Sequence, residues 1–297
     1  MLAFAVLPVA IAVAVVATAA ALVASSGGGG GRSASGSAAP DVAAGDFDGR
    51  RAFRDLRAQV ELGPRPAGSE ASRRLAERLR RALPRGRFEA VPGGLRNVVG
   101  TIPGRAPAIV VAAHYDTKDL PGFVGANDGA GGTAAVLELA RSLGGRDRPA
   151  SAPELRFVLF DGEESPDDDR DFYTSGLRGS RAYAARHARE LRAVILLDFV
   201  ADRDLSIPRE AGSDPALWER LRAAARRAGA ARAFPAGTRP AITDDHTPFA
   251  RAGVPAIDLI DFDFPCWHER CDDMSAVSAA SLDRAGEAVH ELLASWR

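Results

Sequence analysis

Apolar and polar positions follow a helical period in the first part of the folded region. Between residues 51 and 83, apolar residues recur every three or four positions, which is the spacing of one helix face. The stretch LGPRPAGS interrupts this pattern, and glycine and proline are typical of turns. The pattern predicts two helices around that turn, with Ser69 and Ser72 placed to begin the second.

After Pro84 the apolar runs become shorter and richer in β-branched residues, as in strands. The predicted strands cover residues 87–91, 97–103, 108–114, 155–161, 193–199 and 254–261. Helical patterns lie between them at residues 130–143, 179–191 and 214–228, and a last one covers residues 279–296. Strands that alternate with helices predict an α/β fold, a mostly parallel sheet with helices on both faces.

The N-terminal pattern is different. Residues 1–24 form an almost unbroken run of Ala, Val and Leu, long enough as a helix to cross a bilayer. No Lys or Arg precedes Arg32, so the positive segment that usually begins a signal peptide is missing. A buried core helix is the alternative, but a Gly/Ser tract follows directly. We therefore expect a signal peptide or N-terminal membrane anchor, a flexible linker over residues 25–46, and a folded domain over residues 47–297.

Composition adds little to this picture. A length of 297 residues, 46% of them hydrophobic, is enough for one large domain. The net charge of −1 gives no reason to expect a nucleic acid as partner, and we expect a monomer.

Candidate chemistry begins with the stretch over residues 108–128. Its strand ends at His114, Asp116 follows, and a loop leads to Asn127 and Asp128 at the start of a helical pattern. Ligands of such folds bind at the carboxyl ends of strands, and His and Asp are metal-ligand types. Asp128 is placed to bridge two ions. The alternative is a strand-end histidine and a helix-capping aspartate.

Two later strands also end in carboxylates. One ends in the run Asp161-Gly162-Glu163-Glu164, in which neighbouring side chains point in different directions. One glutamate can ligate a metal while the other serves as general base, although an exposed acidic loop is the alternative. The other strand ends in Asp198, which is costly after five apolar residues unless it is paired, hydrogen-bonded or bound to metal.

Three of the five histidines lie in these loops or in two others near the C-terminus. They are His114, His246 in the run DDHTPF, and His268 in FPCWH. His187 and His290 fall in helical patterns, where we expect surface residues.

Six motifs occur in order from about Leu62 to the C-terminus: HYDTK, FVGAND, FDGEE, LLDFVAD, DDHTPFARAGVP and FPCWH. Together they resemble the zinc aminopeptidase and glutaminyl cyclase family (metallopeptidase family twenty-eight). The resemblance implies a three-layer α/β/α sandwich with a mixed, mostly parallel central sheet. It also implies one or two zinc ions and a reaction at the N-termini of peptides or proteins.

Matching the motif positions assigns roles to individual residues. The resemblance implies a main zinc held by Asp128, Glu164 and His268, and a second metal site completed by His114 and Asp198, if a second ion binds. It implies Glu163 as general acid and base, Asp244 in a hydrogen-bond network with Asp198, and Trp267 with His246 in substrate binding.

The family has two branches that perform different reactions. HYDTK, FVGA, DGEE, the DDH run and Trp267 resemble the glutaminyl cyclases, which convert N-terminal glutamine to pyroglutamate and release ammonia. NDG and GPRPAGS resemble the dizinc aminopeptidases, and the acidic loop after Glu164 lacks the tryptophan of the cyclases. The cyclase is the favoured prediction and the aminopeptidase the alternative. A metal-free binding module is a remote third, because every ligand position holds a competent residue.

Cys266 and Cys271 are the only two cysteines. Their thiolates could ligate zinc, but zinc has a better site here. In an exported protein we expect a disulfide instead, which would hold the segment that carries Trp267 and His268.

The composition change at the glycine tract generates a first testable prediction. A protein that begins at Gly45 should be soluble and should bind zinc, because the pattern places no core element before residue 47. Size-exclusion chromatography and metal analysis measure both properties. Aggregation of this protein, while the full chain stays soluble in detergent, would show that the apolar run belongs to the core.

Overall fold

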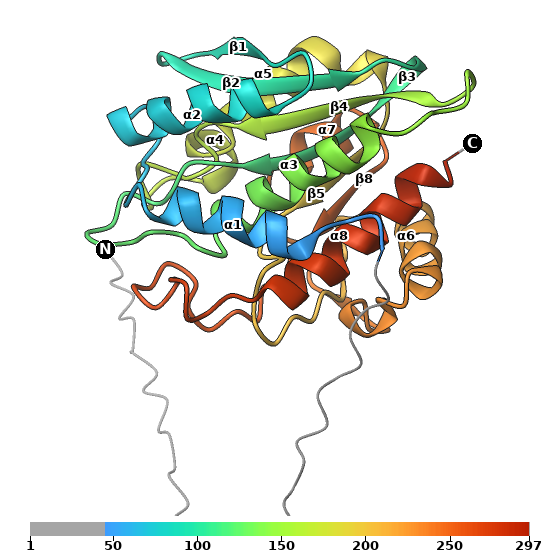
Figure 1. The fold of residues 1–297 in the computed structure, drawn as a ribbon. Helices are drawn as coiled ribbons and strands as arrows, with labels where there is room; N and C mark the ends of the chain where they lie inside the picture. The colour runs from blue at the N-terminus through green and yellow to red at the C-terminus, as the bar shows by residue number, and fades with distance from the viewer. Residues whose placement is uncertain (1–44, 297) are drawn as a thin grey trace, which may run out of the picture. The chain divides into compact units, whose positions relative to one another are not determined.

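The computed structural model describes residues 45–296 (Figure 1). The predicted apolar segment and all but the last two residues of the predicted linker lie outside this range. In the described part of the chain, no helix combines the length and the apolar character that a membrane span requires. The larger helices are α1 (Gly49–Val60), α2 (Glu70–Ala82), α3 (Ala130–Gly144), α5 (Arg178–His187), α6 (Pro215–Arg227) and α8 (Ala279–Ala294). The short ones are α4 (Phe172–Ser175), α7 (Thr247–Arg251) and the 3-10 turns at Ala188–Glu190 and Ala231–Ala233.

The central sheet has six strands in the order β1-β2-β4-β3-β5-β8. Four neighbours, β4 (Pro153–Phe160), β3 (Arg105–His114), β5 (Leu191–Leu197) and β8 (Ala256–Leu259), run parallel. The other two, β2 (Leu95–Ile102) and β1 (Arg87–Val91), add an antiparallel edge. The two-residue strands β6 (Arg209–Glu210) and β7 (Thr238–Arg239) pair with each other outside the sheet. The predicted mixed, mostly parallel sheet is confirmed.

Helices cover both faces of the sheet, which gives the three layers (Figure 1). Side chains alternate along β3, because successive residues of a strand point to opposite faces. Ile109, Val111 and Ala113 belong to the large core cluster shared with α1, α3, α6 and α8. Their neighbours Val110 and Ala112 belong to a smaller cluster with α5 and α7. Because β3 is buried on both faces, its sequence is apolar at every position from Ala108 to Ala113.

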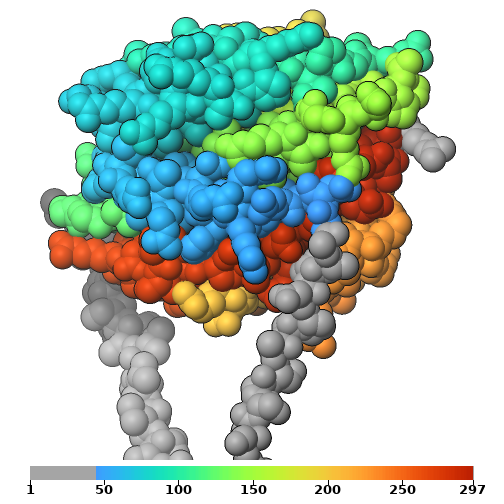
Figure 2. Space-filling view, in the orientation of Figure 1, coloured from blue at the N-terminus to red at the C-terminus, as the bar shows by residue number. Residues whose placement is uncertain are grey.

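Segments far apart in the sequence meet in the larger helical layer. The α1 helix packs against both α3 and α8, and Figure 2 shows blue and red segments in direct contact on this side of the molecule. Phe47 is buried there, and its N–H donates to Glu287 Oε1 at 2.9 Å. The described domain therefore joins its first residues to its last helix.

The parallel strands end at one edge of the sheet. His114 at the end of β3 pairs with Phe160 at the end of β4, and Leu197 of β5 pairs with Leu259 of β8. The loops that follow these strands therefore emerge side by side, as the strand pattern predicts.

The predicted elements agree with the structure to within a few residues at most boundaries. Ser69 is the N-cap of α2, and its side chain accepts a hydrogen bond from the Ser72 N–H. The helices α4 and α7 were not predicted, because a single turn gives no periodic pattern. The surface position expected for His290 is wrong: its ring is buried, and burial lowers its pKa.

Candidate metal centre

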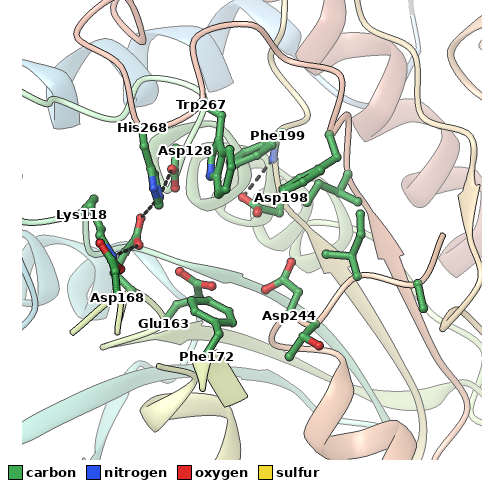
Figure 3. A pocket seen from close by; sticks show the side chains of 16 residues that line it. Lys118, Asp128, Glu163, Asp168, Phe172, Asp198, Phe199, Asp244, Trp267 and His268 are labelled. Atoms are coloured by element: carbon green, nitrogen blue, oxygen red, sulfur yellow. Dashed lines mark hydrogen bonds and ion pairs between the residues drawn. The ribbon is translucent and has the colours of Figure 1, made fainter. Parts of the chain in front are cut away.

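Loops from four parallel strands line one cavity of about 580 Å³ (Figure 3). Asp128 comes from the loop after β3, Glu163 and Glu164 follow β4, and Asp198 follows β5. The segment after β8 supplies Trp267 and His268. The structure thus brings the metal-ligand and acid–base candidates of the sequence to the same edge of the sheet.

The first group of potential ligands is Asp128, Glu164 and His268, whose donor atoms all lie within 4.8 Å of one another. His268 Nε2 is 3.3 Å from Glu164 Oε1 and 3.7 Å from Asp128 Oδ2. In a tetrahedral zinc site, with bonds of about 2.0–2.2 Å, neighbouring donors lie roughly 3.3–3.6 Å apart. The three side chains are thus arranged as ligands of one ion.

A second group shares Asp128. His114 Nε2 lies 3.2 Å from Asp128 Oδ1 and 3.4 Å from Asp198 Oδ1, and the three residues are all buried. Because the two oxygens of Asp128 face different groups, this carboxylate is placed to bridge two ions.

The chemistry of these residues fits a metal ion. Both ring nitrogens of His114 and Oδ2 of Asp128 are buried without a hydrogen-bond partner among residues 45–296. Buried polar atoms are normally paired, and buried carboxylates are expensive unless a cation or hydrogen bonds compensate them. Imidazole and carboxylate donors together suit zinc.

Burial has a large effect on the carboxyl groups of the metal-free protein. It raises the pKa of Glu164 to about 7, with a further contribution from the charge of Asp128. It also raises the pKa of Asp198, and it raises that of Glu163 well above its usual value. Neighbouring carboxylates, Glu164 and Asp244 among them, add to the effect on Glu163. A bound cation would remove this cost for its ligands.

Two further carboxylates hold the ligand loops by their backbones. Asp116 accepts hydrogen bonds from the N–H groups of Glu163 and Glu164, each at 3.2 Å, and lies 3.6 Å from His114 Nδ1. Asp272 accepts from the N–H groups of Asn127 at 2.7 Å and of Asp128 at 3.0 Å. No sequence pattern pointed to this role of Asp272, because its partners lie more than 140 residues away along the chain.

Two residues at the site have a backbone in the left-handed region, which is unfavourable for side chains with a Cβ atom. They are Phe199, with φ of 32°, and His268, with φ of 53°. Phe199 directly follows Asp198, and its N–H donates to the Asp198 carboxylate at 3.0 Å. Such conformations persist where the surrounding structure imposes them, and they cluster at functional sites.

The expected disulfide between Cys266 and Cys271 is present. It closes a short loop that contains Trp267 and His268, and Asp272 follows it directly. This disulfide therefore restrains His268, which is a potential ligand, and its neighbour Trp267. It also restrains Asp272, whose carboxylate holds the backbone of Asp128.

Aromatic side chains face each other across the cavity. Trp267 is 47% exposed and lies against Phe262, with ring centroids 5.0 Å apart. Phe172 from α4 lines the cavity from the side of the acidic loop, and Figure 3 shows it below Trp267. The acidic loop lacks the tryptophan of the cyclases, but Phe172, eight residues beyond Glu164 in the unpredicted turn α4, supplies an aromatic side chain on this side of the cavity.

The two remaining candidates, Asp244 and His246, lie in different places. Asp244 lines the cavity, and burial together with the charge of Asp198 raises its pKa to about 6. His246 is only 1% exposed and lies behind the cavity wall, between Glu210 and Asp258. The predicted contact of His246 with substrate therefore has no support in its position.

Comparison with known proteins adds independent information. The model of peptidase family M28 matches residues 97–293. Glutaminyl-peptide cyclotransferase of Bothrops jararaca is 31% identical over 236 residues, which cover 63% of this chain and 61% of that protein. The Drosophila melanogaster protein of the same name is 29% identical over 222 residues, with the same coverage. The chain thus spans about three fifths of the length of these curated relatives.

Solved structures of two kinds are similar. Glutaminyl cyclase of Porphyromonas gingivalis has a TM-score of 0.74 at 26% identity and covers 84% of this chain and 99% of its own. An Acidobacteriales bacterium glutaminyl cyclase has a TM-score of 0.72 at 30% identity, covering 89% and 98%. A Bacteroides thetaiotaomicron protein described as a leucine aminopeptidase precursor has a TM-score of 0.74 at 25% identity, covering 84% and 98%.

The two adjacent glutamates should have separable roles. Glu164→Gln should lower zinc affinity by more than the roughly 10–100-fold that loss of an outer-shell partner costs, because a charged ligand is removed. Glu163→Gln should leave zinc affinity within a few fold. Zinc titration against a competing chelator measures both, and equal losses in the two variants would contradict the assignment.

The pKa values predict how the metal-free protein responds to pH. Glu164 and Asp272 have pKa values raised to about 7 in the folded protein, so their charged forms are disfavoured by folding. Their contribution to stability is fully present below about pH 4 and is lost as pH rises through about 7. In a chelator, the midpoint of thermal unfolding should fall over this range, and zinc should abolish the fall near pH 7. A chelated protein whose midpoint rises steadily from about pH 4.5 to 7 would contradict the account.

Proposed function

Because the chain belongs to peptidase family M28, we propose that it is a zinc-dependent enzyme that acts on the N-termini of peptides or proteins. We propose further that its reaction is glutaminyl-peptide cyclisation, in which N-terminal glutamine becomes pyroglutamate and ammonia leaves. The observation that carries this proposal is the cavity, in which the ligand group faces a pocket with aromatic side chains. The similarity to cyclotransferases and cyclases supports it.

The pocket combines aromatic side chains with the carboxylates of the ligand group. In Figure 3 Trp267 lies above the carboxyl groups of Glu163 and Asp244, and Phe172 lies below them. A flat primary amide can pack between such rings, while its polar atoms reach the ligand group. The neutral α-amine of a peptide would then lie close to the carboxylates, which can accept hydrogen bonds from it.

In this proposal Asp128, Glu164 and His268 hold zinc, which when bound polarises the carbonyl of the substrate γ-amide. Glu163 lies beside these ligands and is only 7% exposed. It accepts a proton from the α-amine as the amine nitrogen bonds to the carbonyl carbon (Cδ) of the side-chain amide, and it passes that proton to the departing nitrogen as the bond between Cδ and that nitrogen breaks. Ammonia and the cyclic amide are the only products, so no water is consumed.

Orientation supplies much of the rate in such an intramolecular attack. The aromatic walls hold the side chain, and Asp244, opposite Glu163 in the cavity, is placed to receive the α-amine (Figure 3). Asp198 also lines the cavity and adds a further carboxylate to its wall. Lys118 lies in the wall with its ammonium hydrogen-bonded to the Ser165 carbonyl at 2.8 Å and paired with Asp168.

The alternative is a dizinc aminopeptidase, and one observation favours it. His114, Asp128 and Asp198 form a complete second ligand group around the bridging carboxylate. With two ions, Glu163 would take a proton from water, and the first peptide bond would be hydrolysed.

The location of the protein is part of the proposal. A disulfide persists in oxidising compartments, so the Cys266–Cys271 bond supports an exported domain. The apolar run over residues 1–24 would supply the signal or the membrane anchor.

A peptide with N-terminal glutamine distinguishes the two reactions. Zinc-loaded protein should release ammonia from it and leave a blocked peptide of unchanged length, as shown by mass spectrometry and an ammonia assay. Glu163→Gln protein serves as the control for spontaneous cyclisation, and it should be slower by about 10²–10⁴-fold. Release of free glutamine, or cleavage of a leucine-initiated peptide without ammonia from the glutamine peptide, would favour the aminopeptidase.

The aromatic walls can be tested in the same assay. Trp267→Ala and Phe172→Ala should each lower kcat/KM for the glutamine peptide by about two- to tenfold, because an aromatic contact contributes about 0.5–1.5 kcal/mol. Neither change should alter zinc content, since neither residue offers a ligand atom. If both variants kept full kcat/KM, the glutamine side chain would not bind between these rings.

A further inference from the structure

A second cluster of buried polar side chains lies behind the cavity wall. It contains Glu210 at the end of β6, Asp244 and His246 just before α7, and Asp258 within β8. All four residues are between 0% and 3% exposed. Only Asp244 also lines the cavity.

Five polar atoms of this cluster lack hydrogen-bond partners among the described residues. Both carboxylate oxygens of Asp258, Oδ2 of Asp244, Oε1 of Glu210 and Nδ1 of His246 are buried without a hydrogen bond among the described residues. A protonated His246 would balance only one of the three carboxylates, and no ion pair joins them to an arginine or to Lys118 within residues 45–296. Several buried charges of one sign require a compensating cation or bound protons.

The distances favour a cation. Donor atoms of Asp244, His246 and Asp258 all lie within 4.8 Å of one another, and His246 Nδ1 is 3.6 Å from Asp258 Oδ2. That separation is long for a hydrogen bond, but it is close to the separation of neighbouring donors on one zinc ion, roughly 3.3–3.6 Å. It also lies within the 3.2–3.7 Å found around Asp128.

The surroundings of His246 repeat those of His114. His114 directs Nε2 at two potential ligands, Asp128 and Asp198, and directs Nδ1 at Asp116. His246 directs Nδ1 at Asp258, and its Nε2 lies 3.5 Å from Glu210 Oε1. A carboxylate behind the second ring nitrogen is the usual partner of a metal-bound histidine, because it fixes the tautomer and the ring orientation.

We propose that Asp244, His246 and Asp258 bind a further divalent cation, zinc by the chemistry of its donors, and that Glu210 orients His246 behind it. This site is separate from the two groups that share Asp128. The other oxygen of Glu210 accepts hydrogen bonds from the Gly212 N–H at 2.6 Å and the Ile242 N–H at 3.2 Å. Because Ile242 and Asp244 line the cavity, the cation would fix that wall from behind. The inference does not depend on the reaction proposed above.

Anomalous diffraction at the zinc edge tests the site directly in the unaltered protein. Crystals of the full chain grown with zinc should show a peak between His246 Nδ1, Asp244 and Asp258, in addition to a peak beside Asp128. A peak beside Asp128 with none at His246 would overturn the inference and leave the proposed function intact. A peak at His246 alone would support the inference and contradict the zinc site of the proposed enzyme, and absence of both peaks would overturn both.

Metal content of matched variants gives a second measurement. Asp258→Asn should lose one equivalent of zinc relative to wild type in mass-spectrometric metal analysis. Asp261→Asn is the control, because Asp261 is also buried, two residues past the end of β8, and instead accepts a hydrogen bond from the Ser206 N–H at 2.6 Å. Equal zinc content in wild type and in a folded Asp258→Asn protein would overturn the inference. If Asp258→Asn does not fold, the diffraction experiment on wild type decides alone.

Discussion

The burial of many carboxylates at one edge of a parallel sheet is the constraint on which the site depends. Glu163, Glu164, Asp128 and Asp198 are all at most 7% exposed, and few positive side chains lie among them. Isolated charges in such surroundings are strongly disfavoured. A cation held between them changes this, because each carboxylate then gains a partner in exchange for its lost hydration. Metal binding and the stability of this part of the fold are therefore expected to be linked.

The rest of the site holds these ligands in place before any metal binds. Asp116 and Asp272 fix the backbones of the two ligand loops, and the Cys266–Cys271 disulfide restrains the segment of His268. In known metal sites, carboxylates placed like those of Asp116 and Asp272 orient the ligands and do not bind the ion themselves. The left-handed backbone conformation of His268 is unfavourable, but the short disulfide-closed loop can impose it.

Much of the fold and of the candidate site could be predicted from the sequence, for identifiable reasons. Strands such as β3 are long apolar runs, so a carboxylate in the loop after such a run is easy to recognise in the sequence. Asp128, Glu164 and Asp198 could be found in this way. Phe172 was missed because it lies in a single helical turn. Asp272, Glu210 and Asp258 were missed because their partners are distant in the sequence, and burial of a single acidic residue has no periodic signature. His246 was assigned to substrate binding because it belongs to the same motif as Asp244, DDHTPF. Asp244 lines the cavity, but His246, two residues further along the chain, lies behind the cavity wall.

The most direct test of the account is a count of the protons released when zinc binds. Glu164 and Asp244, with pKa values of about 7 and about 6, carry protons in much of the metal-free protein near pH 6. Calorimetric titration of zinc into metal-free protein, in buffers of different ionisation enthalpy, gives the number of protons released per ion. The account predicts release of about one proton or more at pH 6, and less release in Glu164→Gln protein. Zinc binding without proton release, or identical release in that variant, would contradict the claim that buried carboxylates at this edge hold the metal.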